Sequence, residues 1–556
     1  MTATLCFAHK RYLRLHGLGW CFTPLALAAL TLVPRAGAQR VTVTPLVTLG
    51  GETDERVRLS QLLGQSASNG YLIRSASSQS SVFSGSDSAS WRAGLVAPEV
   101  RAIHNSGLPF SLNDGPLWAG RGWSQEITAG LLLQAGRIRL IAAPTLVSED
   151  NEIFQVIPYP QNVARPRNVW ANPFHPLPES IDLPIRFGDK RHRRLDPGQS
   201  SLTIDAGLVS AGAATENLWW GPGIRNAITL SNNAAGFPHL FVRSNGPVHT
   251  RAGIFDAQWI LGQLSESGFF YQTSTHAKRS LSGLVATWSP LSDSGLTLGV
   301  SRLVMGSQSG TGFPLGSAFD VLRTVGHPFT DTTTPPRTTG RYDQLFSLFA
   351  RWVLPPSGFE AYVEWARFEE PLSLTDLLEY PGHSEGYTLG LEWAHPLAAR
   401  HTFQLQSEVS YLEPDPSLRL RPVATTYTSR AVPEGFTQRG QTLGAAIGPG
   451  SSSQWLAADV FAPRWRIGSY LNRIRWDNGV LFEPIVPQFK RQDVTLLAGL
   501  RGGVSWSGVN LLVDFAHAAR FNYLYQAYTL APLRAGGIDL INNTVSVTLS
   551  TAVGRR

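Results

Sequence analysis

The sequence is poor in cysteine, in charge and in long apolar runs, and each shortage excludes a class of protein. Its two cysteines, Cys6 and Cys21, both lie near the N-terminus. If that segment is removed, no disulfide framework and no cysteine-based metal site remains. Charged residues make up 16% of the chain, well below the roughly 25% of ordinary soluble domains. This low fraction indicates a large apolar or interfacial surface. Beyond the N-terminus no run of about 18 apolar residues occurs, so a helical membrane protein is not expected.

The N-terminus has the parts of an export signal. Lys10, Arg11 and Arg14 precede an apolar core, and the small residues "AGA" follow that core. We therefore predict a signal peptide over residues 1–38 and a mature chain that starts at Gln39. The segment contains four of the 47 basic residues and none of the 40 acidic ones, so its removal lowers the formal net charge from +7 to +3. A nucleic-acid partner is then not expected.

Residues 39–90 are predicted to form a small helical and loop region on the periplasmic side. In "TDERVRLSQLLGQ", Thr53 can cap a helix, the leucines share one face, and Gly64 can end the helix. The serine-rich stretch at 75–90 is typical of a loop.

Residues 91–556 have the pattern of β-hairpins. The short turns "LSDSG" and "PPSG" each join two strand-like segments, whereas 306–343 and 413–439 are long and polar. Short turns that alternate with long loops are typical of an outer-membrane barrel. Strands that cross lipid must pair all their backbone groups, which requires closure into a barrel.

The strands themselves support this interpretation. In "FEAYVEWARFEE" apolar and polar side chains alternate, and the C-terminal "NNTVSVTLSTAVGRR" alternates like a closing strand. A tally of candidate strands gives roughly 16 to 20, which is within the size range of such barrels. A secreted β-sandwich or propeller is the soluble alternative, but no blade-length repeat is evident.

Enzyme motifs are scarce. "GHSEG" fits the pattern G-x-S-x-G at Ser384, but a strand-like segment follows where a nucleophile elbow requires a helix. His104 and Ser106 are the other candidates for a barrel-embedded hydrolase. Glu364 is expected to line the lumen and to be solvated by channel water. Zinc-protease, phosphate-loop and dinucleotide motifs do not occur, and we predict no catalysis, no metal and no cofactor.

The stretch "NLWWGPGIRNAITLSNN", residues Asn217–Asn233, combines features of a sugar site. An indole face suits the apolar side of a sugar ring, asparagine amides suit hydroxyl groups, and Gly-Pro-Gly stiffens the backbone. The alternative is structural. Trp219 and Trp220 would then anchor at the membrane interface, while Asn232 and Asn233 would make turn or lumen hydrogen bonds.

At this motif the sequence resembles the Wzi family of outer-membrane capsule assembly proteins. The resemblance rests on "WWGPG" followed by "LSNNA", with "GYLIRSAS" and "PGHSEGYTLGLEW" in support. It implies an 18-stranded barrel with a small N-terminal helical region. It also implies a non-catalytic lectin that holds capsular polysaccharide on the cell surface.

We therefore predict an all-β protein of the cell outer membrane, a large antiparallel transmembrane β-barrel of about 18 strands that contacts outer-membrane lipid. Its expected partner is capsular polysaccharide or exopolysaccharide, and a porin or substrate-specific channel is the alternative. The predicted polysaccharide-binding residues are Trp219, Trp220, Asn226, Asn232, Asn233, His383 and Tyr387.

Overall fold

The computed structural model describes most of the predicted mature chain. It covers residues 42–79, 91–156, 169–175, 180–270, 278–308, 310–323, 342–369, 374–397, 400–415, 425–481, 491–525 and 538–551. The predicted signal peptide and the start at Gln39 lie outside the described residues. Among the helices described, none is both long and apolar enough to cross a membrane.

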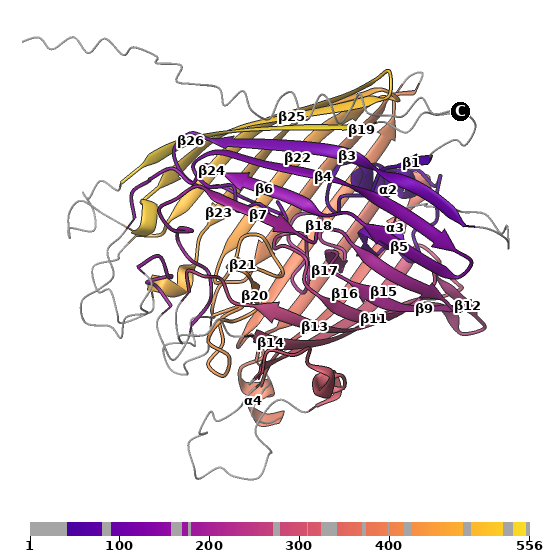
Figure 1. Cartoon of the computed structure of the whole chain (residues 1–556), viewed down its shortest axis with the longest axis horizontal. Coiled ribbons are helices and arrows are strands. Elements are labelled where there is room, and N and C mark those ends of the chain that lie inside the picture. The colour runs from indigo at the N-terminus through magenta and orange to yellow at the C-terminus, as the bar shows by residue number, and fades with distance from the viewer. Residues whose placement is uncertain are drawn as a thin grey trace, which may run out of the picture. The chain divides into compact units, whose positions relative to one another are not determined.

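Eighteen antiparallel strands close into one barrel within the described chain (Figure 1). Fifteen are continuous: β3 (Arg92–Asn105), β4 (Gly122–Ala135), β9 (Val209–Ala214), β13 (Gly253–Ser265), β14 (Lys278–Ser289), β15 (Leu296–Gln308), β16 (Tyr342–Leu354), β17 (Phe359–Arg367), β18 (Glu385–Pro396), β19 (Thr402–Tyr411), β22 (Ser452–Phe461), β23 (Trp465–Arg475), β24 (Val494–Trp506), β25 (Val509–Phe521) and β26 (Leu540–Thr551). Three are interrupted: β5 (Ile138–Ala142) with β6 (Thr145–Glu149), β7 (His192–Asp196) with β8 (Ser201–Asp205), and β11 (His239–Ser244) with β12 (Val248–Thr250). The predicted all-β barrel is confirmed.

The barrel closes where β26 pairs with β3, from Thr544 opposite Asn105 to Ser550 opposite Glu99. The C-terminal strand thus closes the barrel as its alternation predicts. Further along β3, the short strand β1 (Thr42–Thr44) lies parallel to it, with Val43 opposite Leu95. The first described strand therefore pairs with β3 next to the part of β3 that pairs with β26.

The remaining helices and strands do not form part of the barrel wall. They are α2 (Glu52–Leu62), β2 (Ile73–Ser75), α3 (Ala76–Gln79), β10 (Leu218–Trp220), η1 (Leu315–Ser317), η2 (Asp320–Leu322), η3 (Pro355–Ser357), α4 (Leu374–Glu379), β20 (Thr437–Gln438), β21 (Gln441–Thr442), η6 (Asn478–Leu481) and η7 (Tyr523–Tyr525).

The two ends of the barrel differ. At one end, here the turn end, strands are joined by short connections: 136–137, 206–208, 251–252, 290–295, 355–358, 397–401, 462–464 and 507–508. At the other end, here the loop end, the connections are 106–121, 150–191, 215–238, 266–277, 309–341, 368–384, 412–451, 476–493 and 522–539. In outer-membrane barrels the short turns are periplasmic and the long loops extracellular, which orients this one.

Alternation along the strands decides which side chains enter the lumen. Both predicted hairpins are present, β14 with β15 and β16 with β17. In β17, Glu360, Tyr362 and Glu364 are buried and face inward, whereas Val363 faces outward and is exposed. This is the apolar-out, polar-in rhythm that a period of two predicts.

The lumen nevertheless contains a large apolar cluster, here the luminal core. Inward side chains of the wall, mainly from β13–β16 but also from β11 and β23, form part of it, and segments folded into the barrel supply the rest. Its larger members are Tyr71, Leu72, Ile73, Leu218, Trp220, Ile228, Leu230, Phe237, Phe241, Ile260, Leu264, Leu281, Val285, Leu303, Met305, Leu345, Phe349, Phe368, Leu412, Tyr427, Phe436, Leu443, Ile447 and Ile474. The barrel is therefore packed inside like a soluble domain.

The N-terminal segment differs from the prediction in two places. Helix α2 begins at Glu52 after Gly51, with Asp54 accepting the N–H of Gly50 at 2.9 Å, so Thr53 is not its cap. Gly64 ends it as predicted, with a φ of +68° that suits a helix C-terminus. The start of the serine-rich stretch is not a loop. Ser75 and Ser77 are buried in β2 and α3, since their hydroxyls bond Arg243 and Glu216.

Candidate functional site

The "NLWWGPG" motif lies in the 215–238 connection, which folds from the loop end into the lumen. Its strand β10 pairs antiparallel with β2, with Trp219 opposite Arg74. Trp219 is 1% exposed and Trp220 is fully buried. The indole N–H of Trp219 donates to the Gly223 carbonyl at 3.2 Å, and that of Trp220 donates to Gln258 at 3.1 Å. Both indoles are thus engaged inside the protein.

The Gly-Pro-Gly turn is fitted against the barrel wall. Gly221 has a φ of +102°, and a Cβ there would lie 3.0 Å from a carboxylate oxygen of Glu364. Only glycine adopts this backbone conformation without strain. The motif therefore needs glycine both for its backbone angle and for close approach to Glu364.

Two carboxylates of the wall hold the loop that follows. Glu408 accepts the backbone N–H groups of Ile224 at 2.7 Å and of Asn226 at 2.9 Å, and the hydroxyl of Tyr362 at 2.8 Å. Glu364 accepts the N–H of Ile228 at 3.1 Å. Glu364 is buried, so the expectation that channel water solvates it is wrong; protein donors satisfy it instead.

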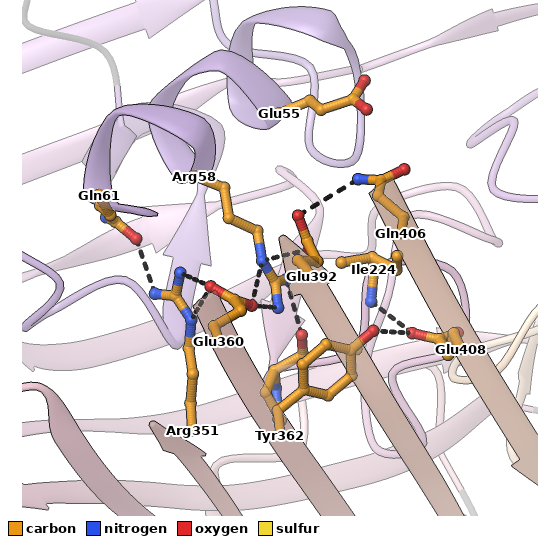
Figure 2. Close-up of polar contacts among 12 residues, drawn as sticks. Glu55, Arg58, Gln61, Ile224, Arg351, Glu360, Tyr362, Glu392, Gln406 and Glu408 are labelled. Carbon is orange, nitrogen blue, oxygen red and sulfur yellow. Dashed lines mark hydrogen bonds and ion pairs between the residues drawn. The ribbon is translucent and has the colours of Figure 1, made fainter. Parts of the chain in front are cut away.

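Helix α2 contributes an arginine that reaches the same region (Figure 2). Arg58 pairs with Glu360 and Glu392, the latter at 2.8 Å, and donates to the carbonyl of Pro222 at 2.7 Å. Burial alone would lower the pKa of Arg58, but Glu360 and Glu392 raise it above its ordinary value. Arg58 therefore stays charged and joins the helix, the motif and the wall.

A second arginine completes this buried ionic cluster. Arg351 of β16 pairs with Glu360 at 2.5 Å and donates to the side chain of Gln61, one helical turn beyond Arg58, at 2.7 Å (Figure 2). Three strands and one helix thus share one network, here called the Arg58 cluster: Arg58, Gln61, Arg351, Glu360 and Glu392. Such desolvated pairs hold well only when every member is satisfied.

The N-terminal part of helix α2 is held by two further ion pairs. Glu55 accepts from Arg466 at 2.7 Å and from Arg501 at 3.3 Å. Burial alone would raise the pKa of Glu55, but these two guanidinium groups lower it to about 2. The helix is therefore anchored by an acid that is ionised over the whole neutral range.

This anchor predicts a pH dependence. Because the folded-state pKa of Glu55 lies below its ordinary value of 4.5, its stabilisation is fully present above pH 4.5 and is lost as the pH falls through about 2. The melting temperature of wild type should exceed that of Glu55→Gln at neutral pH. The difference between the two should shrink across that acidic window, and a constant difference would contradict the assignment.

The side chains of the predicted asparagines form hydrogen bonds with the barrel wall and with neighbouring segments. Asn226 donates to Ser453 at 3.1 Å, Asn232 to the Leu49 carbonyl at 3.3 Å, and Asn233 to the Thr442 carbonyl at 3.0 Å. All three are buried. A small cavity of about 10 Å³ lies beside this stretch, lined by Asn217, Leu230, Ser231 and Phe237 among others. It is smaller than typical ligand pockets of roughly 300–1,000 Å³.

The last two predicted site residues lie elsewhere. His383 is buried in the connection before β18, and its backbone N–H donates to the Tyr380 carbonyl at 3.1 Å. Tyr387 is on the outer face of β18, where its ring stacks on Tyr411 with centroids 5.5 Å apart. The structure thus brings the five motif residues together and separates His383 and Tyr387 from them.

The candidate hydrolase residues have structural partners. Ser384 has a φ of +60° in a turn, and its hydroxyl accepts the N–H of Glu369 at 3.2 Å. The Ser106 hydroxyl accepts the N–H of Asn543 at 2.8 Å, and the His104 ring packs on Trp123. Within the part of the chain that the structure describes, no group of three or more metal-binding side chains is found.

Sequence reasoning missed the Arg58 cluster. Arg58 and Glu360 are 302 positions apart, and Glu408 lies 182 positions from Asn226. The inward glutamates of β17–β19 were visible in the strand rhythm. Their partners were not, because nothing in a strand pattern shows what occupies a lumen.

A family model described as "Capsule assembly protein Wzi" matches residues 107–509. The structure is similar to Wzi of Escherichia coli, described as an outer-membrane protein involved in group 1 capsule assembly and a carbohydrate-binding β-barrel, with 12% identity, 81% of this chain and 83% of that chain covered, and a TM-score of 0.50.

Two other solved structures match more weakly. They are OccK7 (OpdD) of Pseudomonas aeruginosa, with 11% identity, 83% of this chain and 98% of that chain covered and a TM-score of 0.38, and OccAB2 of Acinetobacter baumannii, with 9% identity, 82% and 97% covered and a TM-score of 0.39. No curated protein matches the sequence.

Proposed function

Because this chain belongs to the Wzi family of capsule assembly proteins, we propose that it is a non-enzymatic outer-membrane barrel that binds capsular polysaccharide or exopolysaccharide and aids its attachment to the cell surface. The E. coli Wzi barrel is described as carbohydrate-binding, which supports this class of ligand. The proposal includes a signal peptide at 1–38, an N-terminal region at 39–90 and a barrel at 91–556.

The observation that carries the proposal is the luminal core. A porin conducts through a polar, water-filled lumen, whereas here Trp220, Phe349, Tyr427 and their neighbours pack into an apolar cluster inside the barrel. Helix α2 and the motif loop are then tied to the wall by buried carboxylates and arginines. A lumen filled in this way favours binding at the surface over passage through the barrel.

A surface suited to sugar lies at the loop end. Five aromatic residues from three connections, here the aromatic cluster, gather there: Trp118, Phe154, Trp170, Phe187 and Phe269. The rings of Trp118 and Phe187 are 4.8 Å apart, and those of Phe187 and Phe269 are 5.5 Å apart. Arg186 lies over the Trp170 ring at 5.0 Å. Trp118, Trp170 and Phe269 are partly exposed, and such rings provide apolar faces for sugar rings.

The residues of the buried motif act differently in this proposal. Trp219, Trp220, Asn226, Asn232 and Asn233 would support binding by holding the loops, while the aromatic cluster would contact the polysaccharide. His383 and Tyr387 remain proposed polysaccharide-binding residues. His383 lies in a connection at the loop end, and Tyr387 lies on the outer face of β18.

Polysaccharide binding tests the proposal directly. Purified wild-type protein should bind the surface polysaccharide of its own host, measured by isothermal titration. Trp118→Ala/Trp170→Ala should weaken binding by about tenfold or more, since each aromatic contact contributes about 0.5–1.5 kcal/mol. Trp506→Ala, an exposed tryptophan at the turn end, is the matched control and should bind normally. Absence of binding by folded wild type would refute the function.

Conductance and activity distinguish the alternatives. In planar bilayers the wild-type protein should show little steady conductance, whereas a substrate-specific channel would open steadily. Degradation of the polysaccharide by wild type that is lost in Ser106→Ala or Ser384→Ala would instead establish a hydrolase.

A further inference from the structure

The described part of the β15–β16 connection, residues 310–323, folds back over the outside of the barrel. We call this segment the outer strap; it contains η1 and η2. Side chains on the outer face of the wall bond its backbone carbonyls. Trp259 and Ser282 both donate to the Ala318 carbonyl at 3.0 Å, and Arg302 donates to the carbonyls of Val321 at 3.0 Å and of Arg323 at 2.8 Å.

The register of the strands shows which surface the strap covers. One outward row runs across β13–β16 and consists of Leu261, Ser282, Val304 and Gln344. All four are buried although they face away from the lumen. The side-chain oxygen of Gln344 also accepts a hydrogen bond from the guanidinium of Arg302 at 2.6 Å. The strap therefore covers polar side chains that would otherwise face the bilayer surface at a cost.

The lipid-facing band begins immediately beside the strap. Leu284 lies two positions from Ser282 along β14 toward the turn end, which is about 7 Å along a strand. In the next outward row, Val300 and Leu348 are exposed. The strap thus lies at the boundary between the apolar band and the loop end of the barrel.

Four large apolar side chains of the strap are exposed, whereas Val321 is buried. Phe319 is 73% exposed, Leu322 69%, Leu315 66% and Phe313 36%. Phe319 also leans on the outward indole of Trp259, with ring centroids 6.4 Å apart. Polar contacts on one side and large apolar side chains on the other are the pattern of a segment that lies in a membrane interface.

We propose that the outer strap is an interfacial anchor whose side chains at 313, 315, 319 and 322 enter the outer leaflet of the membrane. The occupant is lipid because the exposed strap residues lie beside the lipid-facing band of β14–β16, where Leu284 is only two positions from the row that the strap covers. The anchor fixes the height of the barrel in the membrane on this side, independently of any polysaccharide binding.

Spin labels on the full-length protein test this placement. The predicted mature chain has no cysteine, so Phe319→Cys, Leu322→Cys, Val300→Cys and Lys190→Cys each introduce a single label site. Val300 is in the lipid-facing band, and Lys190 is an exposed residue of a connection at the loop end. In phosphatidylcholine vesicles, collision rates with oxygen and with a water-soluble nickel complex report the depth of each label.

Labels at 319 and 322 should favour oxygen over nickel several-fold more than the label at 190, and should resemble the label at 300. Ratios equal to that at 190 would overturn the proposal, because the strap would then be in water. Spin–spin broadening at 319 or 322 that grows with the protein-to-lipid ratio would also overturn it, because a second copy of the chain would be the occupant. Neither result depends on polysaccharide binding, so this proposal and the proposed function fail separately.

Discussion

Replacing Arg58 with alanine is expected to lower the free energy of unfolding by about 3–5 kcal/mol, because removal of one partner leaves buried charges uncompensated. Glu360 and Glu392 are both buried, and Arg58 pairs with both while holding the carbonyl of Pro222. The variant loses the side chain that connects helix α2, the Gly-Pro-Gly turn and the barrel wall. Urea unfolding of the protein in detergent micelles, followed by tryptophan fluorescence, measures the effect.

The same helix supplies the control. Arg56 forms an ion pair with Glu52 at 2.7 Å, but its side chain is partly exposed to solvent. Arg56→Ala should therefore cost less than about 1 kcal/mol. If the two variants were equally stable, the Arg58 cluster would not be what holds α2 in the lumen. The Arg58 variant should also conduct in planar bilayers more than wild type, because its helix is no longer tied to the wall.

Trp220→Ala is the second substitution with a large expected effect. Its indole is fully buried in the luminal core, and loss of a buried tryptophan costs about 3–5 kcal/mol. Trp220→Phe keeps a ring in place but leaves Gln258 without its donor, which should cost about 1–3 kcal/mol. The unfolding experiment described for Arg58 ranks the two variants.

Polysaccharide binding by the same variants separates packing from contact. In our proposal, the folded fraction of Trp220→Phe should bind polysaccharide as wild type does. A variant as stable as wild type that no longer bound polysaccharide would contradict the packing role and would place the sugar on the indole. The Trp219→Ala/Trp220→Ala pair extends the test to both indoles of the motif.

Much of the barrel could be predicted from the sequence because its determinants are local. The turn between β14 and β15, residues 290–295, and the alternation in the nine residues of β17 each depend on one short run of consecutive residues. The period of two then assigns side chains to the lumen or to lipid. The family motif is equally local, because it consists of residues 219–223 and 230–234.

The role of that motif was not local. Whether Trp219 faced a sugar, a lipid or a protein core depended on a loop that folds into the lumen and pairs with β2, 145 positions earlier at Arg74. The burial of Ser75 and Ser77 depended in the same way on Arg243 and Glu216. Composition and periodicity describe a strand or a loop, but they do not show which distant segment fills the space around it.

The seam between β26 and β3 has a consequence for how the molecule is made. At that seam the Thr544 hydroxyl bonds Asn105 across 439 positions of the chain, so the last described strand must arrive before the wall is complete. Contacts between such distant residues form slowly, because the entropy of closing the intervening chain comes first. Helix α2 and the motif loop carry large side chains into the interior, and we expect them to pack there before that final pairing. An error in their packing should then delay the closure of the barrel.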